Sequence, residues 1–235
     1  YRPIHDLTKV LDDFHKRRVI VVGDILLDKY VRGIRERQNP ENPVVPLVNV
    51  TNIEYRLGGA GNVARNLSSL GVTVYLYGQI GKDWYGGKIK ELCGKSGIKA
   101  YFVDSGRETI VKTRVISNGE HLVRVDFGEN GLSPIRGKAE KLLERVIFGE
   151  LNMSDLVIFS DYDKGMFRKN NLAERIIHFA KTKPNNALTL VDPKPANIGC
   201  FYGCDVVRPN RHEAELITGI KYDGNNLREI ALELA

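Results

Sequence analysis

Short runs of apolar residues recur along the chain, and stretches with the apolar spacing of helices separate them. Five runs predict strands, at residues 19–22, 72–77, 155–159, 188–191 and 205–207. Helical spacing is seen at residues 61–71, around 88–93, and at 136–148, 171–181 and 225–235. Near-continuous apolar strands that alternate with helices are typical of a parallel sheet covered on both faces. We therefore predict an α/β domain with a mostly parallel sheet.

A second pattern interrupts this alternation. Residues 110–117 and 120–127 each read as a strand, and Asn118-Gly119 between them is a favoured turn dipeptide for a hairpin. Residues 43–50 (PVVPLVNV) form another extended stretch without a helix beside it. These segments predict a small antiparallel sheet that projects from the α/β body.

A glycine-rich turn, GGAGN at residues 58–62, leads directly into one of the predicted helices. Val63, Leu67 and Leu70 give that helix one apolar face, and Gly71 is a natural stop. The turn fits neither GxxxxGK[ST] nor GxGxxG, so the two best-known nucleotide loops are excluded. Two interpretations stay open: a turn that brings bare backbone and Asn62 to a ligand, or a tight loop with Asn62 as the N-cap.

Polar residues follow every predicted parallel strand. The stretches after the five strands are GDILLDKY, GQIGKD, SDYDKG, DPKPAN and RPNRHE. Because the carboxyl ends of parallel strands meet at one edge of a sheet, we expect these side chains to form a ligand site there. Carboxylates mixed with lysines suit phosphoryl transfer, which needs Mg²⁺ near carboxylates and cations on the phosphates.

Composition narrows the class of protein. The chain has 235 residues, enough for one large domain, and a net charge of +6 without a long Lys/Arg block, so we expect no nucleic-acid partner. We also expect no membrane partner, since no apolar run approaches about 20 residues. Three cysteines, Cys93, Cys200 and Cys204, favour free thiols in a reducing compartment, and we predict a cytoplasmic location.

Four motifs together resemble the ribokinase/phosphofructokinase-B superfamily of sugar kinases. They are GDxxxD at 23–28, GGAxNVAxNLxxLG at 58–71, GxIGxDxxGxxI at 78–89, and Asn-x-x-Glu within 209–219. Within the superfamily, 39–48 (NPENPVVPLV), 112–117 (KTRVIS), 160–165 (SDYDKG) and 192–194 (DPK) most resemble the heptose 7-phosphate kinase half of bacterial ADP-heptose synthases. The resemblance implies a ribokinase-like domain over residues 1–235, with a β lid formed by segments about 30–55 and 108–128.

The resemblance also implies an activity. An ATP- and Mg²⁺-dependent kinase of this kind transfers the γ-phosphate to the anomeric hydroxyl of D-glycero-D-manno-heptose 7-phosphate, for ADP-heptose and lipopolysaccharide core synthesis. It further implies a homodimer formed through the lid. Two alternatives stay open: a kinase for another sugar, and a non-catalytic module that binds sugar phosphate or dimerises.

Functional residues follow from the matching motifs. For the sugar, the resemblance implies Asp24, Asp28, Gly58, Gly59 and Asn62. For the substrate phosphate, Lys112 and Arg114 share one strand face and Arg124 comes from the partner strand, so we assign all three to the lid's anion contacts. For ATP and its phosphates, the candidates are Asp161, Lys164, Asp192, Lys194, Asn210 and Glu213, with Glu213 also ordering Mg²⁺-bound water.

Each set has a plainer interpretation. Asp24 and Asp28 could be solvated loop acids, the lid cations could be ordinary surface charges, and Asn210-x-x-Glu213 is also a capping-box pattern at a helix start. The GAGD turn that carries the superfamily's general base is absent from the sequence. We therefore assign no catalytic residue, interpret the chain as an incomplete kinase domain, and expect it to be inactive alone.

Overall fold

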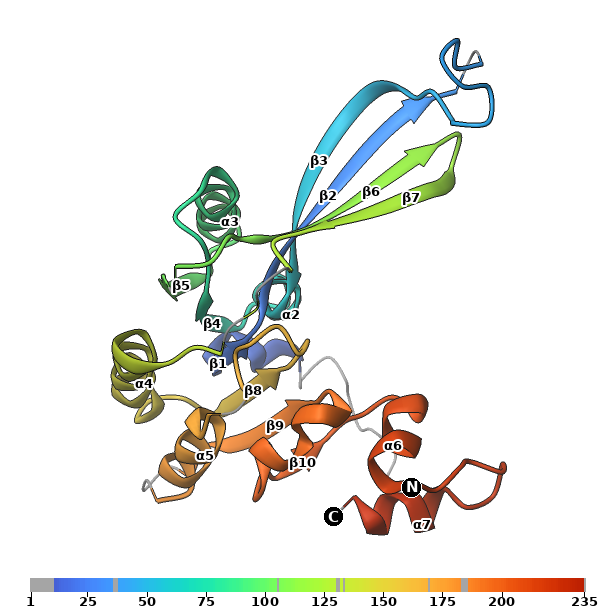
Figure 1. Ribbon diagram of the computed structural model, residues 1–235. Helices are drawn as coiled ribbons and strands as arrows, with labels where there is room; N and C mark the ends of the chain where they lie inside the picture. The colour runs from blue at the N-terminus through green and yellow to red at the C-terminus, as the bar shows by residue number, and fades with distance from the viewer. Residues whose placement is uncertain are drawn as a thin grey trace.

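Two β-sheets of unequal size organise the chain, and the smaller one projects from the larger (Figure 1). The computed structural model describes residues 11–35, 38–104, 106–129, 132, 134–168, 170–182 and 186–234. None of the helices in these ranges is long and apolar enough to cross a membrane.

The larger sheet has six strands in the order β10-β9-β8-β1-β4-β5, and every neighbouring pair is parallel. Its strands are β1 (Arg18–Gly23), β4 (Thr73–Gln79), β5 (Lys99–Val103), β8 (Leu156–Ser160), β9 (Leu188–Asp192) and β10 (Val206–Val207). The prediction of an α/β fold with a parallel sheet is confirmed. The pattern missed β5, because this edge strand is short and mostly exposed or half-buried.

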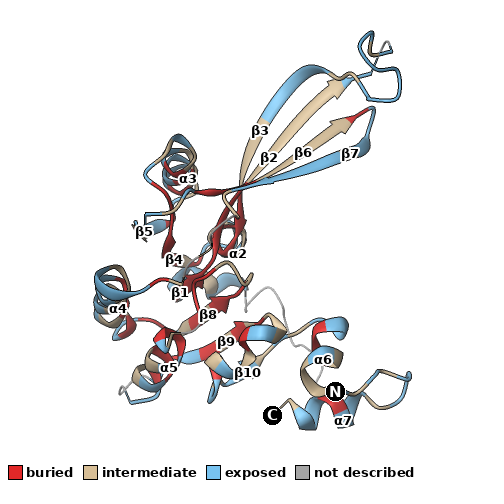
Figure 2. Cartoon of the chain, in the orientation of Figure 1, coloured by how far each residue is buried: buried red, intermediate tan, exposed pale blue. Residues whose placement is uncertain are grey.

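Helices cover both faces of this sheet. Helices α2 (Ala60–Ser69) and α3 (Trp84–Lys95) lie on one face, and α4 (Gly137–Leu151) and α5 (Leu172–Thr182) on the other. Helices α6 (Arg211–Thr218) and α7 (Leu227–Glu233) pack against each other beyond β10 (Figure 1), and η1 (Phe14–Lys16) and η2 (Pro195–Phe201) are short 3₁₀ helices. Alternate residues of β1 point to opposite sides: Ile20 and Val22 join the core under α4 and α5, whereas Val19 and Val21 join the core under α2 and α3. The buried part of β1, red in Figure 2, therefore has apolar side chains on both faces.

The smaller sheet has the order β3-β2-β6-β7 and is mixed. Its strands are β2 (Ile25–Ile34), β3 (Asn49–Gly59), β6 (Ile110–Ser117) and β7 (Glu120–Phe127). The outer pairs are antiparallel, but β2 and β6 run parallel, which corrects the expectation of an antiparallel sheet. The cause is that β2 follows β1 and β6 follows β5, and β1 and β5 run in the same direction in the larger sheet. Both lid strands therefore start from the carboxyl ends of these parallel strands.

Two details of the smaller sheet bear on the sequence patterns. The hairpin between β6 and β7 turns at Asn118 (φ 50°) and Gly119 (φ 85°), the left-handed conformations that this dipeptide favours. Of the extended stretch 43–50, only the last two residues lie in a strand, and β3 continues from there to Gly59. The strand is therefore longer than predicted and ends inside the glycine-rich turn.

The smaller sheet has one polar and one apolar face. The registers place Asp28, Arg56, Lys112, Arg114, Arg124 and Asp126 together on what we call the polar lid face. Val31, Ile53, Val115, Val123 and Val125 share the opposite side, the apolar lid face. Ile53, Val123 and Val125 are each about half exposed, and pale blue marks much of β3 and β7 in Figure 2.

Candidate functional site

The glycine-rich turn packs its backbone against the junction of β1 and β2. Gly59 has φ +57°, and a Cβ there would lie 2.3 Å from the carbonyl oxygen of Asp24. The amide of Ala60 donates to the same oxygen at 3.0 Å. Helix α2 begins at Ala60 with Gly59 as its N-cap, so Asn62 lies in the first helical turn. The interpretation of Asn62 as the N-cap is therefore wrong.

Gly58 leaves space for the carboxylate of Asp28. A Cβ on Gly58 would lie only 2.9 Å from Asp28 Oδ2, which explains why this position has no side chain. Asp28 Oδ1 accepts a hydrogen bond of 2.6 Å from Arg114 Nη1 across the β2–β6 pair. The Asp28 side chain is about 20% exposed, so it is a partly buried acid beside the turn rather than a solvated loop acid.

Asp24, directly after β1, is fully buried and accepts hydrogen bonds from the loop that follows β8. Its Oδ2 accepts hydrogen bonds from the amides of Tyr162 (2.9 Å) and Lys164 (3.0 Å), and its Oδ1 accepts one from the amide of Met166 (3.1 Å). Burial raises the pKa of Asp24 to about 6, although these amides act in the opposite direction. Asp24 therefore shapes the loop after β8 and is not a solvated acid.

Asp161 plays a similar part at the ends of β8 and β9. Its carboxylate is buried and accepts hydrogen bonds from the amides of Asp163 (2.8 Å) and Lys194 (3.0 Å) and from Asn197 Nδ2 (3.1 Å). The side chain thus joins the two loops that carry Lys164 and Lys194. It holds the carboxyl ends of these strands in place, and its own oxygens are occupied.

The capping box at the start of α6 is present. Asn210 Oδ1 accepts from the amide of Glu213 at 2.9 Å, and Glu213 Oε2 accepts from the amide of Asn210 at 3.0 Å. Lys194 Nζ donates to the other oxygen of Glu213. Burial opposes ionisation of Glu213, but the bonds from Lys194 and Asn210 outweigh it and lower the pKa of Glu213. Glu213 is therefore charged, buried and held from two sides.

The same edge carries oxygen donors suited to Mg²⁺. Asp192, the last residue of β9, is about 40% exposed, and its pKa is raised by burial and by the charge of Glu213. Mg²⁺ keeps several waters and binds through few carboxylates together with substrate phosphates. The described residues contain no cluster of three or more His, Cys, Asp or Glu side chains able to hold a metal alone. Asp192 is thus the more accessible carboxylate at this edge, and Glu213, whose two oxygens are held by Lys194 and Asn210, could reach a metal only through water.

The three lid cations predicted from sequence are all engaged in ion pairs. Arg114 binds Asp28, and Arg124 Nη2 lies 2.9 Å from Asp126 Oδ2 with about half of its side chain exposed. Lys112 Nζ lies 3.8 Å from Asp126, and Glu129 is its nearer partner at 3.4 Å. The structure thus brings Asp28, Lys112 and Arg114 together on the polar lid face, and leaves Arg124 at its solvent-exposed margin.

Arg107, which the sequence analysis did not single out, reaches into this region. Its Nη1 donates to the carbonyl oxygen of Lys164. Its Nε and Nη2 are buried and have no hydrogen-bond partner among the described residues. Burial lowers the pKa of Arg107 and the nearby charge of Asp24 opposes this, so the guanidinium stays charged. The only sequence signal was a basic residue shortly before a lid strand, which is too common to be informative.

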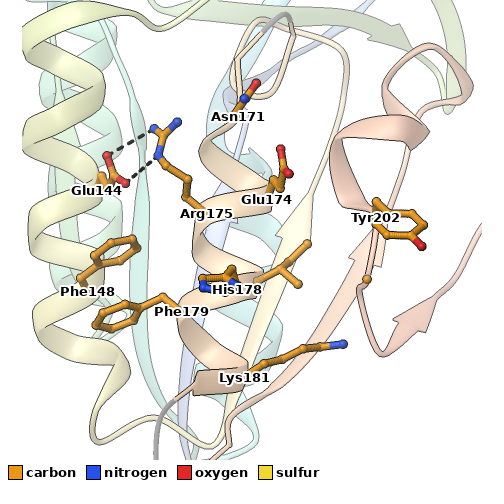
Figure 3. A pocket seen from close by; sticks show the side chains of 11 residues that line it. Glu144, Phe148, Asn171, Glu174, Arg175, His178, Phe179, Lys181 and Tyr202 are labelled. Atoms are coloured by element: carbon orange, nitrogen blue, oxygen red, sulfur yellow. Dashed lines mark hydrogen bonds and ion pairs between the residues drawn. The ribbon is translucent and has the colours of Figure 1, made fainter.

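A cleft of about 590 Å³ lies elsewhere, between α4 and α5. Figure 3 shows Arg175 turned toward Glu144 in an ion pair and the stacked rings of Phe148 and Phe179, whose centroids are 4.1 Å apart. Tyr202 closes the other side and is 88% exposed. None of the predicted site residues lines this cleft. The polar strand ends and the lid, rather than this cleft, carry the candidate site.

Comparison with known proteins fits this geometry. A family described as pfkB family carbohydrate kinase matches residues 16–234. The chain is 36% identical over 224 residues to the "Bifunctional protein HldE" of Hydrogenovibrio crunogenus, covering 95% of this chain and 45% of that protein. It is also 36% identical to the "D-beta-D-heptose 7-phosphate kinase" of Bordetella bronchiseptica, covering 93% of this chain and 67% of that protein. The chain therefore spans less than half the length of the bifunctional relatives that it matches.

Solved structures share the fold at low sequence identity. Phosphofructokinase-2 from Escherichia coli, in its tetrameric inhibited form, superposes with a TM-score of 0.68 at 17% identity, covering 93% of this chain and 69% of that one. An Arabidopsis thaliana ribokinase complexed with ribose and ATP gives a TM-score of 0.61 at 16% identity, covering 93% and 67%. At such identities, the superpositions bear on the fold alone.

Proposed function

This chain belongs to the pfkB family of carbohydrate kinases, and we propose that its site serves the phosphorylation of D-glycero-D-manno-heptose 7-phosphate at the anomeric hydroxyl. The sequence likeness to a heptose 7-phosphate kinase over 93% of the chain supports this substrate. We propose the same biological setting, the supply of ADP-heptose for lipopolysaccharide core synthesis in the cytoplasm.

The observation that carries the proposal is the contact between the glycine-rich turn and Asp28. Gly58 has room for the Asp28 carboxylate only because it lacks a side chain. A sugar placed at this turn meets bare backbone on one side and a carboxylate acceptor on the other, which suits a ligand with many hydroxyls. In this proposal Asp28, Gly58, Gly59 and Asn62 hold the sugar, and Asp24 supports them by fixing the junction of β1 and β2.

ATP and Mg²⁺ belong at the neighbouring strand ends. Lys194 carries an ammonium group to the end of β9, and α6 adds the positive end of a helix. Asp192 and Glu213 would hold Mg²⁺ through water, and the ion would neutralise charge on the transferred phosphoryl group. Asp161 contributes by holding the two loops, and Asn210 by holding the start of α6.

We further propose that the apolar lid face is the surface of a homodimer. Val31, Ile53, Val115, Val123 and Val125 form a contiguous apolar strip on it. Exposed strips of this kind on a sheet mark interaction surfaces. Pairing two lids through these strips would leave both polar lid faces turned toward their own sugar sites.

Turnover and binding measurements test the substrate. Kinase activity should be assayed in the longest natural form of the protein with ATP and Mg²⁺, using the heptose 7-phosphate, the dephosphorylated heptose and fructose 6-phosphate. We expect the heptose 7-phosphate to give the highest kcat/KM by at least tenfold. A preference for another sugar would favour a different pfkB kinase. Binding without turnover in every natural form would favour a non-catalytic sugar-phosphate module.

A further inference from the structure

A single carboxylate bridges the lid and the body of the protein. Glu129, two residues after β7, places Oε2 2.8 Å from Lys164 Nζ and Oε1 3.4 Å from Lys112 Nζ. Lys112 belongs to the lid strand β6, and Lys164 to the loop after β8. The sequence motifs place these lysines on different phosphates, whereas in the structure one carboxylate holds both of them.

The backbone fixes where this carboxylate lies. Gly128 has φ +76°, and a Cβ on it would lie 2.8 Å from the carbonyl oxygen of Thr109. The chain therefore turns back tightly against the start of β6 in a conformation that favours glycine. This turn brings Glu129 to the root of the lid.

The charges around Glu129 are unbalanced. The side chains of Lys112, Lys164 and Glu129 are only 15%, 20% and 26% exposed, so water screens them weakly. Two ammonium groups share the Glu129 carboxylate, and the guanidinium of Arg107, bonded to the backbone of Lys164, has Asp24 as its nearby negative charge. Asp126 is farther from Lys112, at 3.8 Å, and also pairs with Arg124. Glu129 Oε1 is buried without a hydrogen bond among the described residues.

We propose that Lys112 and Lys164 form one site for the phosphate group that the sugar carries, and that Glu129 occupies this site as a counter-ion until the phosphate displaces it. This proposal rests on the proposed function, because it assumes a substrate that already bears a phosphate. A phosphate monoester carries about two negative charges and three acceptor oxygens, so it matches two ammonium groups better than one carboxylate does. Arrival of the phosphate releases Glu129 and keeps the lid joined to the body.

The test compares variants by their affinity for inorganic phosphate, measured by titration calorimetry at low salt. Glu129→Gln removes the competing charge and nearly preserves the shape, so we expect phosphate to bind roughly tenfold more tightly than to the wild type. Glu91→Gln is the matched control, since Glu91 on α3 is also a carboxylate held by two lysines, Lys88 and Lys95, but lies outside the lid. It should leave the affinity unchanged. Adding Lys164→Met to Glu129→Gln should abolish the gain.

Unchanged or weaker phosphate binding by Glu129→Gln, in a variant whose melting temperature stays within about 2 °C of the wild type, would overturn the proposal. A variant that melts earlier is compared at a temperature where both proteins are folded. If Glu129 instead binds a sugar hydroxyl, Glu129→Gln will weaken binding of the dephosphorylated sugar and leave inorganic phosphate unaffected, which also overturns it. A gain for inorganic phosphate without any preference for the heptose 7-phosphate would reject the proposed substrate and keep the anion site.

Discussion

Arg114 Nη1 donates to Asp28 Oδ1 at 2.6 Å, joining a residue assigned to the sugar hydroxyls with one assigned to the sugar's phosphate. Both side chains are largely buried, with 25% of Arg114 and 20% of Asp28 exposed, so the pair is poorly screened by salt. Tyr30 stacks beside the guanidinium at 5.3 Å and limits its movement. The two residues therefore hold each other in position on the polar lid face.

This pairing predicts coupled effects on catalysis. Asp28→Ala should lower kcat/KM by on the order of 10²-fold, because a poorly fixed acceptor hydroxyl costs about that much. Arg114→Ala should weaken binding of the phosphosugar about tenfold to a hundredfold. Since each single change also releases the other residue, the double variant should lose less than the sum of the two losses in free energy. Steady-state kinetics of all four proteins would measure this coupling, and strict additivity would contradict it.

Arg107 should contribute to binding of an anionic substrate. Its Nε and Nη2 are buried and unpaired among the described residues, and a buried cation is costly without a partner. We expect Arg107→Met to weaken binding of the phosphosugar about tenfold and to leave the dephosphorylated sugar nearly unchanged. Arg107→Lys keeps the charge but lacks the planar fork, so it should restore only part of the affinity.

Arg17 provides the matched control for this measurement. Arg17 precedes β1 and pairs with Asp155, which precedes β8, so both lie at the amino ends of the parallel strands and far from the candidate site. The Arg17 side chain is 57% exposed. Arg17→Met should leave both affinities as in the wild type. If Arg107→Met weakens both ligands equally, the guanidinium braces the loop after β8 and does not contact the phosphate.

Patterns along the chain predicted the β6–β7 hairpin of the lid and every strand of the larger sheet except β5, but they missed β2. After Arg18, β1 is apolar and buried on both faces, and such strands are easy to recognise. β2 was missed because Asp28, Lys29 and Tyr30 interrupt its apolar residues and look like a polar loop. In the structure Asp28 and Tyr30 lie on the polar lid face and Lys29 on the opposite face, so the segment is a strand with a polar side rather than a loop.

The sequence motifs predicted which residues form most of the candidate site, but not which side chains they contact. The spacing of Asn210 and Glu213 predicted the capping box, because it depends only on neighbours in the same helix. The ion pair of Glu213 with Lys194 joins residues 19 positions apart and depends on the packing of α6 against η2. Local patterns carry no information about such contacts, which is also why Arg107 and Glu129 were missed.

Asp24 should titrate well above ordinary aspartates. Burial raises the pKa of Asp24 from 3.8 to about 6, so the folded protein binds a proton more tightly than the unfolded chain. The contribution of Asp24 to stability is therefore fully present below about pH 4 and is lost as the pH rises through about 6. Carboxyl ¹³C NMR would follow this titration, with Asp104 and Asp223, whose pKa values are lowered, as internal references. A midpoint for Asp24 below 4 would contradict the expectation.

Charges on the apolar lid face should abolish the proposed dimer. Val123 and Val125 are 48% and 55% exposed and lie on the apolar lid face of β7. Val123→Glu combined with Val125→Glu would place like charges in the paired strips, so we expect the dimer dissociation constant to rise at least a hundredfold. Sedimentation velocity at several concentrations would measure it. Leu142→Glu on α4 is the control, since Leu142 is similarly exposed, at 46%, but lies outside the lid. A wild type that sediments as a monomer would reject this interface.

Separate variants can distinguish the structural role of the Asn210–Glu213 box from its proposed role in binding Mg²⁺ and ATP. Asn210→Ala removes an N-cap acceptor and should cost about 1 kcal/mol of stability, whereas Asn210→Ser keeps a good cap and should cost little. Glu213→Gln keeps an oxygen that can reach the amide of Asn210, so the box survives while the negative charge is lost. Thermal unfolding should therefore rank Asn210→Ala as the least stable of the three box variants.

If Glu213 orders magnesium-bound water, the ranking of these variants by kinase activity should differ from their ranking by stability. We expect Glu213→Gln to lower kcat by tenfold or more and to raise the Mg²⁺ concentration needed for half-maximal rate, while the KM for the sugar stays within about twofold. Loss of the charge also frees Lys194, which Glu213 holds, so Lys194→Met serves as a companion variant. If Lys194→Met alone reproduces the altered Mg²⁺ requirement, the effect of Glu213 passes through the lysine. If Asn210→Ala and Glu213→Gln lower the rate only in proportion to their loss of stability, the motif is a helix cap without a role toward the metal.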